Sequence, residues 1–372
     1  KAEGEEAKSS KGKMPDLTPR QLEQLKKAIQ KQKDFQNQEV KKKKLSKKDA
    51  RSMKAMEESG IELEEIKYDR KTYSGDKYTD KQNVYVIKNV TQTLIDSNQF
   101  GEMFSNYHYS LDRQRTAIKE GLVLGKMLGK KLKVRAEQRD TKFNRLRSGK
   151  IDKRRISSAG FGVENIFAKI ESFAYNPGLI HISIDNSGSM GGGRFQNAVT
   201  TAVAIAKACS MIENMDCVIS FRAGSDFAGN EMPVVLIAYD SRKHGMNQIK
   251  TMMPYCCTSG ITPEGLCFEA IMKEIVSSAR GKDAYFVNMS DGMPYYGNYS
   301  GEAAWNHTRA QVKNMTKEGI KVISYFITGS NGIHDSERKA FNAMYGKEAQ
   351  YIDTKKINEV AKSMNSKFLE IA

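Results

Sequence analysis

The sequence predicts an α/β fold, a mostly parallel sheet with helices on both faces, preceded by a basic helical region. Two observations predict it. From residue 179 onward, short runs of β-branched and aromatic residues alternate with longer amphipathic stretches, as in repeated βαβ units. The positive charge is concentrated in the first 160 of the 372 residues. A neutral α/β domain with a basic N-terminal appendage is therefore expected.

The net charge of +16 is unevenly spread. Residues 1–60 hold 17 Lys/Arg against 10 Asp/Glu, and residues 111–160 hold 16 against 5. Residues 61–110 hold 6 against 8, and residues 161–372 hold 21 of each. The excess in the N-terminal half favours anionic partners, either nucleic acid or an acidic protein surface.

Residues 1–60 are predicted to be a Lys-rich helical or flexible segment. Helical spacing of apolar residues begins after Thr18 and Pro19, and the Lys41–Lys48 run then opposes compact structure by charge repulsion. Residues 61–164 are expected to form a basic, mainly helical linker or accessory region. Within it, a short strand is predicted at 84–87 and a helix at 111–132.

The five cysteines, an odd number in the C-terminal half, indicate a reducing compartment, and a cytoplasmic location is expected. Buried free thiols are favoured over a disulfide between the adjacent Cys256 and Cys257. No run of about eighteen apolar residues occurs, so no membrane contact is expected. Because the chain begins with Lys1 instead of Met, we expect a fragment or a processed product.

The predicted α/β domain covers residues 165–372. Alternation and length separate its strands from its helices. Strands are predicted at 179–184, 217–221, 234–239, 284–289 and 321–327, and helices at 195–211, 262–278, 302–317, 335–345 and 355–369.

Oxygen-bearing side chains lie at the ends of three of these elements. Asp185, Ser187 and Ser189 come directly after the first strand, Thr262 opens a helix, and Asp291 ends another strand. Ligands gather at the carboxyl ends of parallel strands, and a hard cation needs about six oxygens. The sequence therefore predicts one site for Mg²⁺ or another divalent cation.

Two alternatives stand beside that interpretation. Asp185 could cap the following helix, with Ser187 and Ser189 in ordinary turns, although this does not explain three matching junctions. Thr258 is a rival for Thr262, which is preferred because it follows Gly260 by two residues and opens the predicted helix.

Asp-x-Ser-x-Ser at 185–189, Gly-x-Thr at 260–262 and Ser-Asp-Gly at 290–292 together resemble the metal-ion-dependent adhesion site of von Willebrand factor A (VWA) domains, which are Rossmann-like. In more detail, 185–190, 290–294 and 148–152 resemble the VWA-bearing subunit of aerobic cobaltochelatase. The loop at 260–265 departs from the chelatase and is similar to the wider VWA family.

The resemblance implies that Ser187, Ser189 and Thr262 coordinate the ion through hydroxyls, and that Asp185 and Asp291 act largely through waters. It implies an acidic ligand from a partner protein at the cation, and a non-catalytic role beside an AAA+ ATPase of the MoxR or chelatase type. Catalysis by the chain alone is not expected, because its five histidines show no paired spacing.

The alternative function is nucleic-acid binding through the Lys41–Lys48 run and the Arg135–Arg155 segment, which carry many positive charges. Aromatic residues are few in both segments, so base stacking is not indicated. A third possibility joins the two hypotheses: the basic helices would dock on an acidic surface of the ATPase.

Overall fold

The computed structural model describes residues 47–71, 76–136, 139–173, 177–227, 230–328 and 333–353. Contacts divide the chain into two compact units, residues 1–50 and 51–372. The predictions for residues 16–46, for most of the Lys41–Lys48 run and for a helix at 355–369 lie outside the described residues. The described elements therefore belong almost entirely to the second unit.

The second unit is built on one mixed sheet with the strand order β1-β2-β8-β7-β6-β9-β12-β13. Five of its seven pairings are parallel, and only β1–β2 and β7–β8 are antiparallel. In that order the strands are Ile61–Lys71, Lys77–Ile87, Asn230–Asp240, Met215–Phe227, Gly178–Asp185, Asp283–Ser290, Lys321–Thr328 and Ala349–Asp353. The predicted α/β class with a mostly parallel sheet is confirmed.

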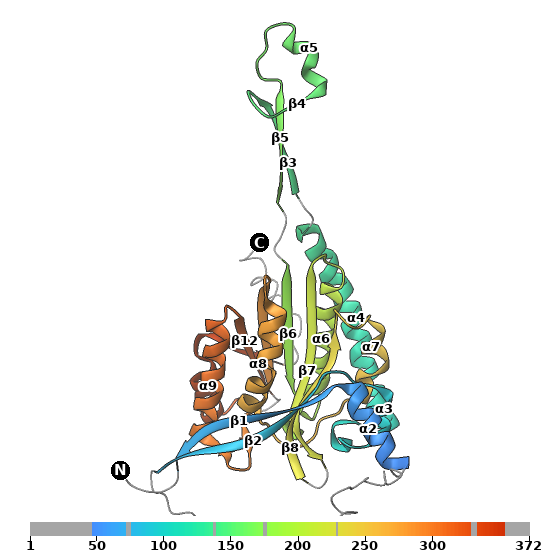
Figure 1. The fold of residues 1–372 in the computed structure, drawn as a ribbon, viewed down its shortest axis with the longest axis vertical. Coiled ribbons are helices and arrows are strands. Elements are labelled where there is room, and N and C mark those ends of the chain that lie inside the picture. Colours follow the sequence, from blue (N-terminus) through green and yellow to red (C-terminus); the bar gives the residue numbers. More distant parts are fainter. Residues whose placement is uncertain are drawn as a thin grey trace, which may run out of the picture. The chain divides into compact units, whose positions relative to one another are not determined.

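Helices cover both faces of this sheet (Figure 1). Ile180, Ile182 and Ile184 of β6 face one core cluster with α3, α4, α6 and α7, whereas Leu179 faces a second cluster with α8, α9 and α10. This two-residue alternation buries every residue of β6. The helices are α2 Lys47–Ser59, α3 Gln92–Ser97, α4 His108–Ala136, α6 Arg194–Cys209, α7 Asn247–Thr251, α8 Glu264–Ala279, α9 Gly301–Lys317 and α10 Asp335–Tyr345.

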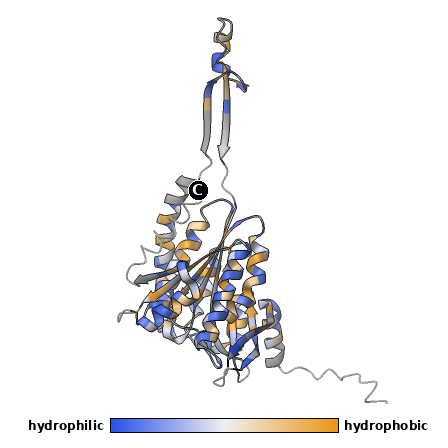
Figure 2. Cartoon of the chain, turned by 90° about the vertical axis from the view of Figure 1, so that its left-hand side faces the viewer, coloured by the Kyte–Doolittle hydropathy of each residue, from blue (hydrophilic) through white to orange (hydrophobic). Residues whose placement is uncertain are grey.

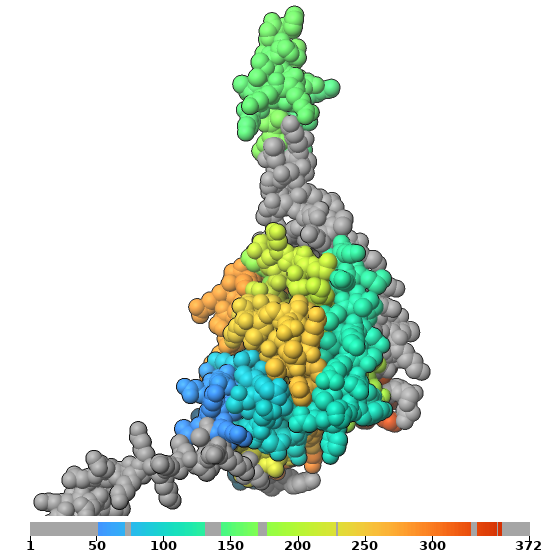
Figure 3. All heavy atoms as spheres, turned by 90° about the vertical axis from the view of Figure 1, so that its right-hand side faces the viewer, coloured from blue at the N-terminus to red at the C-terminus, as the bar shows by residue number. Residues whose placement is uncertain are grey.

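Helix α4 packs closely on α6 through a column of glycines. Gly121, Gly125 and Gly129 recur every fourth residue and are all buried, and a Cβ added at Gly125 would lie 2.5 Å from the carbonyl oxygen of Ala204. Without side chains at these positions the two backbones approach closely. Figure 3 shows α4 as a long ridge on this face, beside the segment with α7.

Residues 61–87 form two strands of the main sheet, where a mainly helical region with one short strand at 84–87 was expected; that strand is present as the end of β2. β2 joins β8 through the pairs Tyr85–Val234, Val86–Val235 and Ile87–Leu236. Burial of Val84, Val86 and Ile87 at 3% exposure or less explains the docking. The contacts of the chain therefore do not divide at residue 165.

Residues 139–173 form a separate three-stranded sheet with the order β3-β5-β4. Its strands are Arg139–Leu146, Lys150–Ile151 and Phe167–Phe173, with a short helix α5 at Ile156–Ala159. Arg139 pairs with Phe173, so both ends of the segment lie together. Among its described side chains only that of Ala168 is buried, and Figure 2 shows hydrophilic and hydrophobic residues mixed in its coloured part.

All five cysteines are free, as favoured from the sequence, and only Cys257 is not fully buried. Within the described ranges no helix is both long and apolar enough to cross a membrane. The short strand β13 at Ala349–Asp353 was not predicted; it adds a parallel edge strand beside β12.

Candidate functional site

The site forms where two neighbouring parallel strands end. β6 and β9 pair in parallel up to Ile184 and Met289. Asp185 is the last residue of β6, and Asp291 directly follows the last residue of β9. The next turns of the chain therefore leave the sheet at the same edge, as expected from the sequence.

Asp185 fixes the position of the loop that follows β6. Its side chain is fully buried, and Oδ1 accepts a hydrogen bond of 2.9 Å from the backbone N–H of Ser187. Oδ2 accepts one of 2.9 Å from the hydroxyl of Ser290. Asp185 thereby joins the ends of β6 and β9 and lies beneath the residues that line the open pocket.

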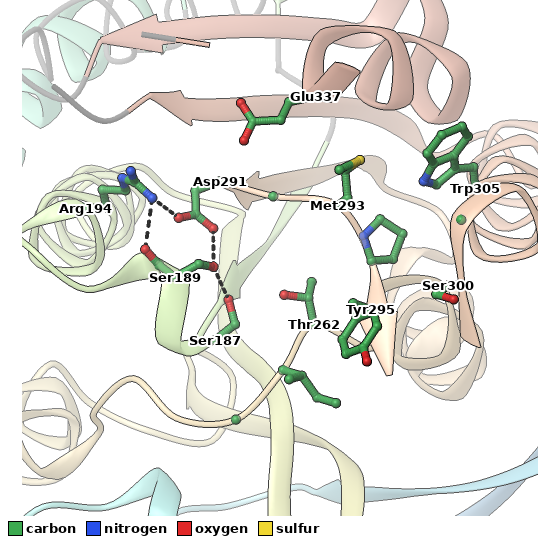
Figure 4. Close-up of a pocket in the computed structure, with 15 residues that line it drawn as sticks. Ser187, Ser189, Arg194, Thr262, Asp291, Met293, Tyr295, Ser300, Trp305 and Glu337 are labelled. Carbon is green, nitrogen blue, oxygen red and sulfur yellow. Dashed lines mark hydrogen bonds and ion pairs between the residues drawn. The ribbon is translucent and has the colours of Figure 1, made fainter. Parts of the chain in front are cut away.

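A chain of hydrogen bonds links three more of the predicted residues, Ser187, Ser189 and Asp291 (Figure 4). Ser189 Oγ donates to Asp291 Oδ1 at 2.8 Å. Because this uses the single proton of Ser189, the Ser187 hydroxyl donates across the 2.9 Å that separates the two Oγ atoms. Arg194 at the start of α6 bonds both the carbonyl oxygen of Ser189, at 2.9 Å, and the Asp291 carboxylate.

Thr262 reaches the same place from a third loop, but it does not open a helix as predicted. It forms an isolated β-bridge with Tyr295, through backbone hydrogen bonds of 3.1 and 2.9 Å, and α8 begins two residues later. Pro263 lacks an N–H and precedes the helix. Figure 4 shows the Thr262 hydroxyl turned toward Ser187 and Asp291.

Gly260 lets this third loop meet the first one. Its carbonyl oxygen accepts a hydrogen bond of 3.0 Å from the N–H of Gly188. Its φ is +62°, and an added Cβ would lie 1.9 Å from the carbonyl oxygen of Gly224. A side chain at this position would push the Thr262 loop away from β7.

Ser187, Ser189, Thr262 and Asp291 line one pocket of about 520 Å³. Thr258, the rival of Thr262, lies in a different pocket with Ser259 and three acidic residues. The remaining residues that line the first pocket are Arg194, Gly260, Ile261, Gly292, Met293, Pro294, Tyr295, Ser300, Gly301, Trp305 and Glu337.

The electrostatics of this pocket suit a cation. Burial raises the pKa of the Asp291 carboxyl, and the nearby Asp185 raises it further, while hydrogen bonds from Ser189 and Arg194 lower it. Two carboxylates thus share a buried site in which Arg194 supplies positive charge. Hydroxyl and carboxylate oxygens are the ligands that hard divalent cations prefer, and the donor set fits such an ion.

A buried polar network supports the site from beneath. Arg222 of β7 lies opposite Asp185 of β6 in the strand register. Its guanidinium donates hydrogen bonds to Glu264 at 2.7 Å and to Ser183 at 3.0 Å. Asn288 of β9 donates to the same Glu264 oxygen at 3.0 Å and to Tyr345 of α10 at 2.9 Å. Because Glu264 opens α8 two residues after Thr262, this network ties the Thr262 loop to the sheet.

The sequence did not indicate Arg194, Met293, Tyr295, Trp305 or Glu337 as site residues. Two weak signals were present: Arg194 follows three consecutive glycines after the serine motif, and Trp305 is the only tryptophan of the chain. Neither signal reveals that a residue from α9 or α10 lines the pocket, because that depends on how the helices pack.

No protein-family model matches the sequence, and no curated protein matches it either. Solved structures similar to part of the chain include the manganese-loaded TRAP protein of Plasmodium vivax, at 9% identity and a TM-score of 0.36, covering 50% of this chain and 71% of that one. The open pilus adhesin SpaC of Lactobacillus rhamnosus GG is 13% identical with a TM-score of 0.41, and the match covers 55% of this chain and 31% of the adhesin.

The vWF domain of the type V pili tip protein Mfa5 from Porphyromonas gingivalis is 9% identical with a TM-score of 0.38, covering 54% of this chain and 98% of that one. At these identities and TM-scores the likenesses assign no role to any residue. The chain is an α/β protein by its own strand order and pairings, with a hydroxyl- and carboxylate-lined pocket at the carboxyl edge of its sheet.

Proposed function

We propose that this chain binds one divalent cation, Mg²⁺ in the cell, and uses it to hold an acidic side chain of a partner protein. The observation that carries the proposal is the meeting of three separate loops. Ser187, Ser189, Thr262 and Asp291 line one open pocket although they span more than a hundred residues. Turn formation or helix capping by each loop alone does not require this convergence.

The chemistry of the donors explains why the ligand would be acidic. Ser187, Ser189 and Thr262 offer neutral hydroxyls, and Asp185 lies beneath the pocket with both carboxylate oxygens already hydrogen-bonded. A divalent cation bound there would keep part of its positive charge uncompensated. A carboxylate from a partner supplies the missing charge and an oxygen ligand, so the cation would act as a docking contact.

The partner class that we propose is an AAA+ ATPase assembly of the MoxR or chelatase type, in which this chain is a non-catalytic binding subunit. What supports it is the resemblance of the 185–190 and 290–294 segments to the VWA-bearing chelatase subunit. In such an assembly the cation site would connect nucleotide-driven motion of the ATPase with a client.

Cation binding is measured directly through Trp305, the only tryptophan, which lines the pocket. Titration of Mg²⁺ should change its fluorescence saturably. Ser187→Ala and Asp291→Asn should each weaken binding about 10- to 100-fold, as loss of groups around a metal commonly does. Ser300→Ala is the matched control, because its hydroxyl lines the same pocket away from the proposed donors. Equal affinities for all four proteins would refute the cation site.

Partner binding is tested by pull-down from native lysate with and without EDTA, followed by mass spectrometry. Wild-type protein and Ser300→Ala should retain an AAA+ ATPase only without chelator, and Ser187→Ala should not retain it. Retention that survives both EDTA and Ser187→Ala would show that the association does not use the cation.

A second candidate function is contact with nucleic acid through the β3-β5-β4 sheet. The exposed side chains of Arg145, Arg147, Lys150 and Arg154 favour it. The ion pair of Arg147 with Glu164 is 3.9 Å long, with side chains 81% and 78% exposed, and neutralises little charge. Binding to DNA or RNA should then fall steeply between 50 and about 200 mM salt. Affinity that does not depend on salt would contradict it.

A further inference from the structure

The pocket that holds the proposed cation site has a second, apolar half. Met293 is 40% exposed and Tyr295 57% exposed, although both are large apolar or aromatic residues. Pro294 and Trp305 line the pocket beside them. Figure 4 shows Met293, Tyr295 and Trp305 on the side of Thr262 that faces away from Ser187 and Ser189.

The volume of the pocket exceeds what the cation needs. Six waters around an ion fill roughly 180 Å³, at about 30 Å³ per water. The pocket measures about 520 Å³. More than half of it therefore remains for groups of a ligand other than the carboxylate at the ion.

The apolar half is fixed to the cation half by backbone hydrogen bonds. Tyr295 and Thr262 exchange two bonds of 3.1 and 2.9 Å. Tyr295 and Tyr296 also form a small hairpin with Tyr299 and Ser300. A ligand held by the cation is thus presented to Met293 and Tyr295 at a set distance, without rearrangement of the backbone.

We infer that this apolar half is a side-chain subsite, and that the pocket takes a peptide segment in which an acidic residue at the cation is flanked by a bulky apolar residue. The inference rests on the proposed cation function. Its acidic residue meets the ion and Arg194, and its apolar neighbour covers Met293, Tyr295 and Trp305. Glu337 on the pocket wall disfavours a second acidic residue by charge repulsion.

The preferred peptide sequence follows from how much apolar surface of the pocket the bound peptide covers. Covering exposed Met293 and Tyr295 with an apolar side chain contributes binding through burial. A carboxylate flanked only by small residues leaves both side chains in solvent and gains nothing from them. Selectivity between acidic segments would therefore come from the residue beside the acid.

Three blocked pentapeptides test this inference: Ala-Leu-Asp-Leu-Ala, Ala-Ala-Asp-Ala-Ala and Ala-Leu-Asn-Leu-Ala. Binding is followed by Trp305 fluorescence and by calorimetry, in Mg²⁺ and in EDTA. In Mg²⁺ the first peptide should bind about tenfold more tightly than the second, since each buried methylene adds about fourfold and a leucine is only partly buried. The asparagine peptide should bind most weakly.

Met293→Ser should bring the first two peptides to nearly equal affinity and leave Mg²⁺ binding unchanged. Tyr107→Ser is the matched control, because Tyr107 is an 82% exposed aromatic residue outside the pocket, and it should leave the tenfold preference intact. Tyr295→Ser should act as Met293→Ser does, which guards against a folding defect in a single variant.

The outcomes separate the two proposals. Equal binding of the leucine and alanine peptides, or no peptide binding while Mg²⁺ still binds, overturns the subsite and leaves the cation site standing. If Mg²⁺ has no effect and the asparagine peptide binds as well as the aspartate peptide, the cation function fails. A leucine preference that Met293→Ser abolishes would still support the subsite in that case.

Discussion

The Arg222–Glu264 pair beneath the pocket allows a quantitative test of how the site is supported. Both side chains are 0% exposed, and their nitrogen and oxygen atoms are 2.7 Å apart. Arg222→Met keeps the length of the side chain but removes the charge. Glu264 then keeps the amide of Asn288 as a hydrogen-bond donor, and its carboxylate is buried without a cation. Breaking a buried pair in this way costs about 3–5 kcal/mol.

The double variant Arg222→Met/Glu264→Met removes both charges and should recover most of that loss, because an apolar pair of similar volume often replaces a buried ion pair at little cost. The coupling energy of the mutant cycle should therefore reach about 2–3 kcal/mol. Lys54→Met is the control: its ion pair with Glu58 is exposed, and the change should stay within about 0.5 kcal/mol.

The pH dependence adds a second readout. Burial raises the pKa of the Glu264 carboxyl above its ordinary value of 4.5, and Arg222 opposes this. A carboxyl with a raised folded pKa contributes most stability below its unfolded pKa and loses it as the pH rises. Without Arg222 the pKa rises further, so the stability of the single variant relative to the wild type should fall as the pH rises above the ordinary pKa of the carboxyl.

Urea unfolding at pH 5, 7 and 8, followed by circular dichroism and Trp305 fluorescence, measures these free energies. Two results would refute the assignment of a coupled buried pair. One is a loss of unfolding free energy below about 1 kcal/mol for Arg222→Met. The other is a double variant whose loss equals the sum of the losses in Arg222→Met and Glu264→Met. A destabilisation of Arg222→Met relative to the wild type that shrinks as the pH rises would refute the sign of the Glu264 shift.

Three further predictions concern the core and the pocket. Gly125→Ala should lower the free energy of unfolding in urea by about 1–2 kcal/mol, because overpacking against Ala204 exceeds the gain in helix propensity. The control Lys126→Ala, at an exposed position, should change it little. A Gly125→Ala variant that is more stable than the wild type would contradict the close packing of α4 on α6. Burial lowers the pKa of His181 from 6.5 to about 3. The free energy of unfolding should therefore be kept above pH 6.5 and fall by up to about 1.4 kcal/mol per pH unit below it. His181→Leu should lack that pH dependence, and equal pH dependence in both proteins would argue against a neutral buried imidazole. Arg194→Gln should tighten Mg²⁺ binding about tenfold at low salt, because it removes a positive charge from Asp291; weaker binding would assign Arg194 a supporting role.

The central strands were predictable because each is a run of β-branched and aromatic residues buried on both faces. The convergence of Ser187, Ser189 and Asp291 was predictable for a related reason: adjacent parallel strands end at one edge, so the loops after them meet. The position of Thr262 was only partly predictable, since its backbone bridge to Tyr295 joins segments that no local pattern connects.

Strand β1 was missed because its sequence, IELEEIKYDRK, is dominated by charges. It lies at the edge of the sheet, where one side of the strand has no neighbour among the described strands and charged side chains are tolerated. Helix α4 was predicted at 111–132 and is present, but the role of its glycines was not predicted. Within a helix they weaken local propensity, and their value appears only in the contact with α6, which is a tertiary feature.

The small sheet at 139–173 begins and ends at one point, because Arg139 and Phe173 are paired. It can therefore be treated as a detachable module. Replacing residues 140–172 with a two-residue Asn-Gly turn would keep α4 and β6 on one polypeptide. The shortened protein and the full chain would then form a matched pair of reagents, one of which reports on the pocket without the basic module.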